Sequence, residues 1–175
     1  MARVSYVDES SHPELAALIG EIREERRGRL IPVYGLLLHS PDVARAWLAL
    51  INAVRWRTRL DARVRELVIL RVAALNDAAY VIDVHRRHFT GADGLGAAEC
   101  DALCRAQVPP GVFEEADAAV IAYVDESTRG AKVSPEVFRR VRGFLDERQV
   151  VELSVLIGAY NMHTRVINAL EIDPE

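Results

Sequence analysis

The stretch DARVRELVILRVAAL, residues 61–75, constrains the fold more than any other part of the chain. Asp61 is a typical residue for the start of a helix, and the apolar side chains after it wind around most of the helix axis. A helix that is apolar on most sides is stable only when other elements cover it. We therefore expect this helix to lie at the centre of the domain.

The remaining segments also carry helix signals. Ser40 and Pro41 begin one helix, and Ser134 and Pro135 begin another. Further helices are expected over 10–28, 78–89 (capped by Asp77 and ended by the glycines of TGADG, 90–94), 96–107, 114–130 and 148–170. No run of alternating β-branched residues and no hairpin turn competes with these signals. The chain is therefore expected to be all-α, with about seven or eight helices.

Composition excludes several classes of protein. A chain of 175 residues that is 50% apolar and 27% charged fits a single globular domain, 1–175. Its net charge of −4 offers no basic surface for nucleic acid. The N-terminus lacks the apolar core of a signal peptide, and the apolar run LVILRVAAL is too short to span a bilayer. We expect a cytoplasmic protein with no nucleic-acid or membrane partner.

Two cysteines, Cys100 and Cys104, lie four residues apart in the frame CDALC. This spacing places them on one face of a helix but differs from the CxxC spacing of redox and metal sites. We expect two ordinary reduced thiols that are partly buried.

The stretch LNDAAYVIDVHRRH, residues 75–88, carries two histidines at its end, and three interpretations compete. His85 and His88 share a helix face, but a metal ion needs a third ligand, and His163 is the only remote candidate. Alternatively, the basic residues complement the dipole at the end of the helix. The third interpretation is proton transfer, for which histidine is well suited near neutral pH.

A histidine that transfers protons needs a carboxylate partner, and Glu66 is the candidate. Glu66 begins the preceding apolar helix, where a carboxylate is costly unless it is paired. Glu66 lies ten residues before Asn76 and His85 lies nine residues after it. If the two helices pack antiparallel across that turn, the two side chains meet.

The run RVRELVILRVAALNDAAYVIDVHRRHFTGADGL, residues 63–95, resembles the core of the carboxymuconolactone decarboxylase and alkylhydroperoxidase D superfamily. The matching features are the R-x-x-E-L-x-I-L-R-V-A helix, the Tyr80-x4-His85 spacing and the following Gly-Leu. HSPDVARAWLAL upstream and VELSVLIGAYNMHTRVINAL near the C-terminus are also similar to longer family members. The specific core motif is about 61–95, and about 1–33 is an N-terminal extension.

The resemblance implies an alkylhydroperoxidase D-like helical bundle that forms a homo-oligomer. The last helix or the helix from Trp47 to Trp56 would bury the subunit interface.

The peroxidase branch of the family works through the spacing E-x11-C-x-x-C-x-x-x-H. On this chain the glutamate is Glu66 and the histidine is His85, but Ala78 and Val81 stand at the two cysteine positions. Without those thiols, dithiol peroxidase chemistry has no nucleophile and no resolving partner. Where the decarboxylase branch commonly has Tyr-Glu-Trp, this chain has Tyr80 followed by Val-Ile, so a polar group of that branch is missing as well.

The resemblance therefore implies a cofactor-independent enzyme, without a metal, that performs acid/base chemistry on a small anionic or carbonyl-containing molecule. Decarboxylation, lactone or enol chemistry and isomerisation all need such groups. His85 would be the general acid or base, Glu66 would orient it, and Tyr80 would bind or polarise an oxygen. Arg71 would hold a substrate carboxylate, or else form a surface salt bridge.

Two alternatives remain open at this stage. One is an alkylhydroperoxidase-like antioxidant protein. The other is a non-catalytic oligomeric binding protein in which Glu66 and His85 merely pair in the core. An open pocket at His85 favours the enzyme, whereas a His85 sealed by Val81, Ile82 and Phe89 favours the binding protein.

Overall fold

The computed structural model describes residues 1–89, 91 and 94–173. Over these residues the protein is all-helical, with no β-strand. Two short 3-10 turns, Glu9–Ser11 and Pro13–Leu15, precede nine α-helices, of which all but α2 have at least seven residues. These are α1 (Ala16–Glu25), α2 (Pro32–Leu37), α3 (Pro41–Trp56), α4 (Ala62–Leu75), α5 (Ala79–His88), α6 (Ala97–Leu103), α7 (Glu115–Gly130), α8 (Pro135–Arg142) and α9 (Glu147–Leu170). The predicted all-α class and its approximate helix number are confirmed.

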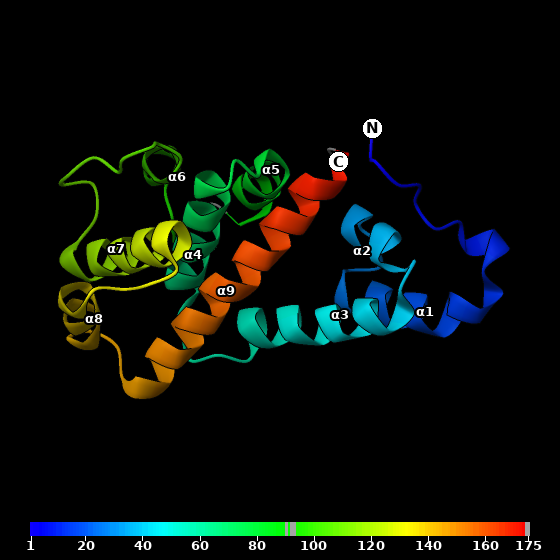
Figure 1. Cartoon of the computed structure of the whole chain (residues 1–175), viewed down its shortest axis with the longest axis horizontal. Helices are drawn as coiled ribbons and strands as arrows, with labels where there is room; N and C mark the ends of the chain where they lie inside the picture. The colour runs from blue at the N-terminus through cyan, green and yellow to red at the C-terminus, as the bar shows by residue number, and fades with distance from the viewer. Residues whose placement is uncertain (90, 92–93, 174–175) are drawn as a thin grey trace.

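Helix α4 is the central element, as its sequence predicts. Eight consecutive residues, from Glu66 to Ala73, are buried, and α4 packs against α5, α6, α7 and α9. In Figure 1 the long helix α9 crosses the molecule diagonally beside α4, and α3 extends from there towards α1 and α2. One hydrophobic cluster includes residues of all nine helices. The core is therefore continuous from the N-terminal helices to α8.

Helix caps account for some of the boundaries and correct one prediction. Asp61 accepts a hydrogen bond from the Val64 amide at 2.8 Å, and Ser134 accepts one from the Val137 amide at 3.3 Å. The prediction that Asp77 caps α5 is wrong. Asp77 has a left-handed φ of 52° and forms the turn itself, so that Ala78 takes the N-cap position without a side-chain hydrogen bond.

Two other boundaries differ from the prediction. The segment that begins at Ser10 forms two 3-10 turns before α1 starts at Ala16. Helix α2 was not predicted, because its six residues are apolar and its N-cap is an isoleucine, which gives no polar start signal. Gly91 and Gly94, the predicted end of α5, both have positive φ, while residues 90, 92 and 93 of that loop lie outside the described residues.

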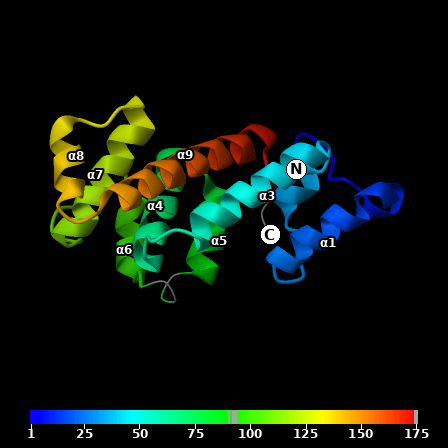
Figure 2. The same cartoon turned by 90° about the horizontal axis from the view of Figure 1, so that it is seen from below.

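The N-terminal segment is fastened to the end of α9. The Arg3 amide donates to the Leu170 carbonyl at 2.9 Å, and its guanidinium pairs with Glu171 at 2.6 Å. The Ala2 amide and the Tyr6 hydroxyl both contact the Asp173 carboxylate. Figure 2 shows the two ends of the chain close together, with α1 below them. These contacts hold the N-terminal segment against the last turn of α9.

Within the described residues, no helix combines the length and apolar character that crossing a membrane requires.

Candidate functional site

Helices α4 and α5 bring Glu66 and His85 together. His85 Nδ1 lies 2.6 Å from Glu66 Oε2, and both residues are buried, with 5% and 3% of their surface exposed. This is the contact that the antiparallel packing across Asn76 predicted. An ionised carboxylate can only accept a hydrogen bond, so Nδ1 of the imidazole carries the hydrogen.

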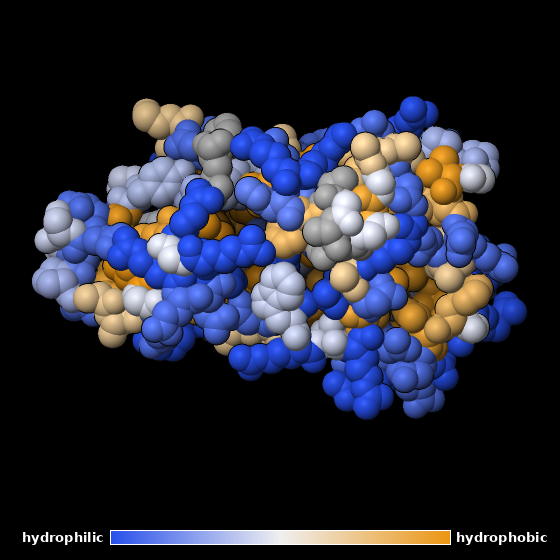
Figure 3. Space-filling model, turned by 180° about the vertical axis from the view of Figure 1, so that it is seen from behind, coloured by the Kyte–Doolittle hydropathy of each residue, from blue (hydrophilic) through white to orange (hydrophobic). Residues whose placement is uncertain are grey.

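A pocket of about 190 Å³ adjoins this pair. Its lining comes from α2, α3, α5 and α9, from the end of α1 and from the segment that connects α1 to α2. Aromatic rings are prominent in it: Tyr34, Trp56, Tyr80, Phe89 and Tyr160. His85 itself belongs to the lining, so it is not sealed by Val81, Ile82 and Phe89. In Figure 3, hydrophobic atoms are visible deep between hydrophilic side chains on the back of the molecule.

Tyr80 also belongs to the lining of this pocket, where it is half-buried. It lies on α5, five residues before His85, and both residues line the pocket, whereas Glu66 contacts His85. His88, the second histidine of the opening motif, is exposed at the edge of the same pocket.

The structure does not bring Arg71 to this site. Arg71 is fully buried on another side of α4, where its Nε and Nη2 bond to Asp125 at 2.5 and 2.8 Å. Its remaining three N–H groups donate to the carbonyl oxygens of Leu103, Arg105 and Ala106. Because all five donors are used within the fold, the expectation that Arg71 holds a substrate carboxylate is corrected. The alternative expectation was a surface salt bridge. Arg71 does form a salt bridge, with Asp125, but its side chain is buried.

The sequence interpretation missed Arg55. Its guanidinium lies between the rings of Trp56 and Phe89, 4.5 Å from each ring centre. Arg55 Nη2 lies 3.5 Å from Glu66 Oε1, yet it is buried and makes no hydrogen bond within the described residues. Arg55 is therefore the second charged neighbour of Glu66. No local signal could have identified it, because the contact joins two helices through the tertiary fold.

Two side chains from α9 complete the inner wall. The Tyr160 ring lies edge-on to His85, with 6.1 Å between ring centres, and burial raises the pKa of Tyr160 to about 12. Burial, assisted by His85 and Arg55, lowers the pKa of His163 to about 3. Both groups are therefore neutral near pH 7. His163 Nδ1 is buried and has no hydrogen-bond partner in the part of the chain that is described.

No thiol lines the pocket among the residues described. Ala78 and Val81, at the family's cysteine positions, are both buried, and Val81 lines the pocket. Cys100 and Cys104 lie on and directly after α6 and form no disulfide with each other. Burial raises the pKa of the Cys104 thiol, which disfavours the reactive thiolate. No group of three or more His, Cys, Asp or Glu side chains suitable for a metal ion occurs in the described ranges.

Comparison with known proteins gives a family and a fold. The model of the carboxymuconolactone decarboxylase family matches residues 41–125, which include α3, α4 and α5. No curated protein matches the sequence. A protein of unknown function from Agrobacterium tumefaciens, described as a candidate antioxidant defence protein AhpD, is 26% identical with a TM-score of 0.71. The match covers 80% of this chain and 95% of that one.

Two further solved structures share the fold at lower identity. A peroxidase-related protein from Ralstonia eutropha JMP134 has a TM-score of 0.77 at 17% identity, over 99% of this chain and 92% of that one. The debrominase Bmp8, as a cysteine-to-alanine variant in complex with 2,3,4-tribromopyrrole, has a TM-score of 0.77 at 15% identity, over 100% and 94%. Residues 41–125 therefore belong to the carboxymuconolactone decarboxylase family, and the chain has the alkylhydroperoxidase D-like fold.

Proposed function

We propose that this protein is a cofactor-independent enzyme that transfers a proton to or from a small molecule bound in the pocket at His85. The observation that carries the proposal is the buried contact of 2.6 Å between His85 Nδ1 and Glu66, beside a pocket that His85 lines. A carboxylate that fixes one ring nitrogen of histidine orients the other for proton transfer and stabilises the imidazolium that forms.

Each residue has a defined part in this step. His85 Nε2 accepts a proton from a carbon or oxygen of the substrate and later returns it, while Glu66 keeps the ring in place. Tyr80 donates a hydrogen bond to the substrate oxygen on which negative charge develops. Decarboxylation, lactone or enol rearrangement and isomerisation share this proton transfer, and the proposal covers that class of reaction.

The alternatives predict different chemistry. An antioxidant protein of the alkylhydroperoxidase type would use thiols at the positions of Ala78 and Val81, and their absence argues against a dithiol mechanism. A non-catalytic binding protein has no need for a histidine–carboxylate pair beside its pocket. The pocket at His85 therefore favours the enzyme over both alternatives.

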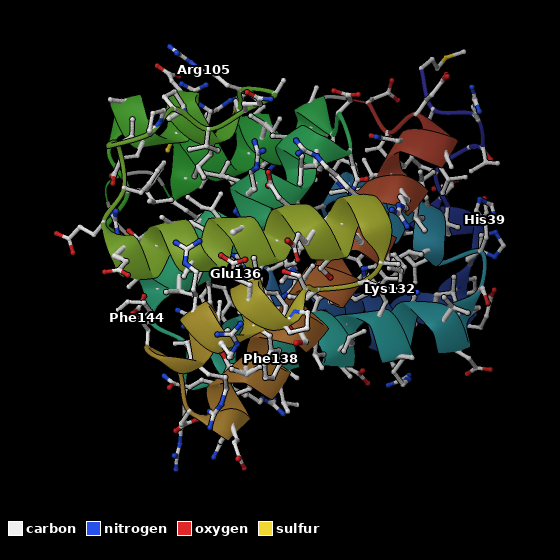
Figure 4. The ribbon with its side chains drawn as sticks, turned by 60° about the vertical axis from the view of Figure 1, so that its left-hand side comes forward. His39, Arg105, Lys132, Glu136, Phe138 and Phe144 are labelled. Atoms are coloured by element: carbon white, nitrogen blue, oxygen red, sulfur yellow. The ribbon has the colours of Figure 1, made fainter. Side chains whose placement is uncertain are left out.

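Deuterium incorporation tests the proposal without a known product. The protein is incubated in D₂O with a panel of small enolisable ketones, β-keto acids and lactones, and exchange at carbon is followed by NMR. We expect exchange above the buffer rate for at least one class, with its loss in His85→Gln. His39→Gln is a suitable control, because His39 is exposed, bonds to the Ser5 carbonyl and projects outward in Figure 4.

No exchange with any class of compound would contradict the proposal. Equal exchange rates in the native protein and in His85→Gln would contradict it as well.

We also propose that the protein self-associates. Four large apolar residues of α8, α9 and the turn between them are each at least 42% exposed and supply apolar surface for such a contact: Phe138, Phe144, Val151 and Val155. Figure 4 shows Phe138 and Phe144 on the outer side of the molecule. Sedimentation velocity should show an oligomer that Phe138→Ser weakens. A monomer at all concentrations would refute this proposal.

A further inference from the structure

The pocket is positively charged although the chain as a whole is acidic. Among the described lining residues are four arginines, Arg26, Arg27, Arg29 and Arg55, and one carboxylate, Glu25. Glu66 lies behind His85 and adds a second negative charge, which leaves a surplus of two positive charges before His85 is counted. The net charge of the whole chain is −4. A pocket of this sign attracts an anion.

Arg55 differs from the other arginines that lie deep in the fold. Arg26 donates to the Tyr34 hydroxyl, the Asn52 side chain and the Glu25 carbonyl. Arg55 has only the ion pair of 3.5 Å with Glu66, and its buried Nη2 makes no hydrogen bond within the described residues. A buried donor without an acceptor is costly and rare in native proteins, so its presence at a pocket calls for an acceptor from a ligand.

The guanidinium of Arg55 is also held in a fixed orientation. Trp56 and Phe89 lie on it at 4.5 Å each, and its side chain is 15% exposed. Stacking on two rings restricts the rotation of the guanidinium plane, which fixes the direction of its donors. A preorganised planar fork matches a carboxylate or a similar delocalised oxyanion.

The rest of the pocket suits a flat molecule. Its lining is mainly aromatic and aliphatic, and it includes two neutral polar groups, the Tyr160 hydroxyl and the His163 imidazole. Like Arg55, His163 presents a buried nitrogen, Nδ1, with no hydrogen-bond partner described. Apolar walls with a few convergent polar groups are the usual composition of a site for a small organic ligand.

We propose that Arg55 is the anion-binding residue of this pocket and that the ligand is a flat, conjugated or aromatic monoanion. The negative oxygens of the ligand bond to the Arg55 guanidinium, and its ring lies among the aromatic side chains near His85. This inference rests on the proposed function, since it names the class of substrate for the same pocket. It also places the substrate anion at α3, whereas the sequence predicted Arg71 on α4 for this role.

The segment between α1 and α2 adds to this specificity. Arg26, Arg27 and Arg29 lie on it, outside the residues 41–125 that the family model matches. Arg27 has a left-handed φ of 54° and Gly28 follows with 81°, so the chain turns sharply at the end of α1. This turn places the basic residues along the pocket. The charge of the pocket is therefore in part a property of this chain beyond the matched family region.

Calorimetric titration with two probes of the same shape tests the inference. Benzoate is flat and anionic, and benzamide is flat and neutral. We expect benzoate to bind the native protein at least tenfold more tightly than benzamide. Arg55→Gln should lose about tenfold or more in benzoate affinity and leave benzamide affinity unchanged. Arg45→Gln is the matched control on the same helix, because Arg45 is exposed, pairs with Glu21 and does not line the pocket.

Equal affinities for benzoate and benzamide, or no binding of benzoate, would overturn the inference, and so would native benzoate affinity in Arg55→Gln. If Arg55→Gln does not fold, benzoate binding by Arg55→Lys tests the role of the guanidinium instead. Lysine keeps the charge but lacks the planar fork, and unchanged benzoate binding there would overturn the role of the guanidinium. The native protein separates the two proposals, because its benzoate affinity and its deuterium exchange are measured independently. Benzoate selectivity without exchange in the native protein would refute only the proposed function.

Discussion

Helix α4 carries two buried charges, Glu66 and Arg71, whose surroundings differ. They are five residues apart and so lie on different sides of the helix. Arg71 uses all five donors on one carboxylate and three carbonyl oxygens of the fold. Glu66 has a histidine that lines a pocket and Arg55, a cation with an unsatisfied donor. Each side buries a charged residue of α4 beside a partner of opposite charge, and the two sides differ in the completeness of their hydrogen bonding.

The difference shows how a structural ion pair can be told from a functional one. A network in which every hydrogen-bond donor has an acceptor stabilises one arrangement of helices, and no donor remains for a ligand. An unsaturated network beside a cavity keeps donors available, at a cost in stability that binding offsets. The comparison makes separate predictions for the two sides of α4.

The largest expected effect is on catalysis at the Glu66 side. His85→Gln should lower the rate of deuterium exchange by about 10²–10⁴-fold, the usual contribution of a positioned general base. The free energy of unfolding should change much less, because glutamine can still donate a hydrogen bond to Glu66. NMR exchange rates and urea unfolding of the same samples test this. If deuterium exchange decreased only in proportion to the fraction of folded protein, the prediction that His85 acts in catalysis rather than in stability would be contradicted.

On the Arg71 side, the expected effect is on stability alone. Arg71→Met should lower the free energy of unfolding by about 3–5 kcal/mol, because Asp125 and three carbonyls lose their partner. Benzoate binding by the remaining folded protein should not change.

Arg129→Met is the matched control for this variant. Arg129 is 52% exposed and contacts the same Asp125 carboxylate and the same Ala106 carbonyl from outside. It should lose less than about 1 kcal/mol. Urea unfolding measures both variants. Similar decreases in the free energy of unfolding for Arg71→Met and Arg129→Met would show that burial of the network does not add to stability.

The next effect, smaller in free energy, concerns pH. His163 has a folded-state pKa of about 3, below the ordinary value of 6.5. As the pH falls below 6.5, the unfolded chain binds a proton that the folded chain does not, so stability decreases on acidification. Between pH 6.5 and pH 5 the loss from this group is about 1–2 kcal/mol.

Urea unfolding at pH 7 and pH 5 measures this loss, and His163→Gln should reduce the difference between the two values. His39→Gln should leave it unchanged. An identical pH dependence in the native protein and in His163→Gln would argue against a buried neutral His163.

The last prediction is that the protein has no peroxidase activity. With alanine and valine at the positions of Ala78 and Val81, the protein should not consume peroxide in the presence of a dithiol reductant above the buffer rate. Loss of peroxide absorbance measures it, and a member of the superfamily with both cysteines is the positive control. Turnover that alkylation of Cys104 abolishes would reverse this account of the site.

Local patterns predicted much of the fold and one contact of the site. Apolar periodicity and helix start signals predicted α3, α4, α7 and α9, and helical rise predicted that Glu66 and His85 meet. These features depend on residues that lie near one another in sequence. The cap at Asp77 was wrong, because the same residue type that caps a helix also adopts the left-handed conformation of a tight turn.

The partners of Arg71 and Arg55 could not be predicted. Asp125 is 54 residues from Arg71, and the carbonyls that complete its network belong to the turn after α6. Arg55 lies eleven residues before Glu66 but on a different helix, and α9 adds Tyr160 and His163 from the far end of the chain. Such contacts depend on how helices pack, which periodicity within one helix does not specify.

The fastening of residues 2–6 to residues 170–173 has a consequence for the order of events during synthesis. A ribosome releases the N-terminal side of a chain first, so residues 2–6 and the part of the pocket between α1 and α2 emerge before α9. The partners of residues 2–6 and two inner side chains of the pocket, Tyr160 and His163, emerge only with α9. The central helices can collapse earlier, but the pocket is completed only when α9 has left the ribosome. A nascent chain that stalls before α9 therefore has the pair of Glu66 and His85 without the inner wall of the pocket beside it.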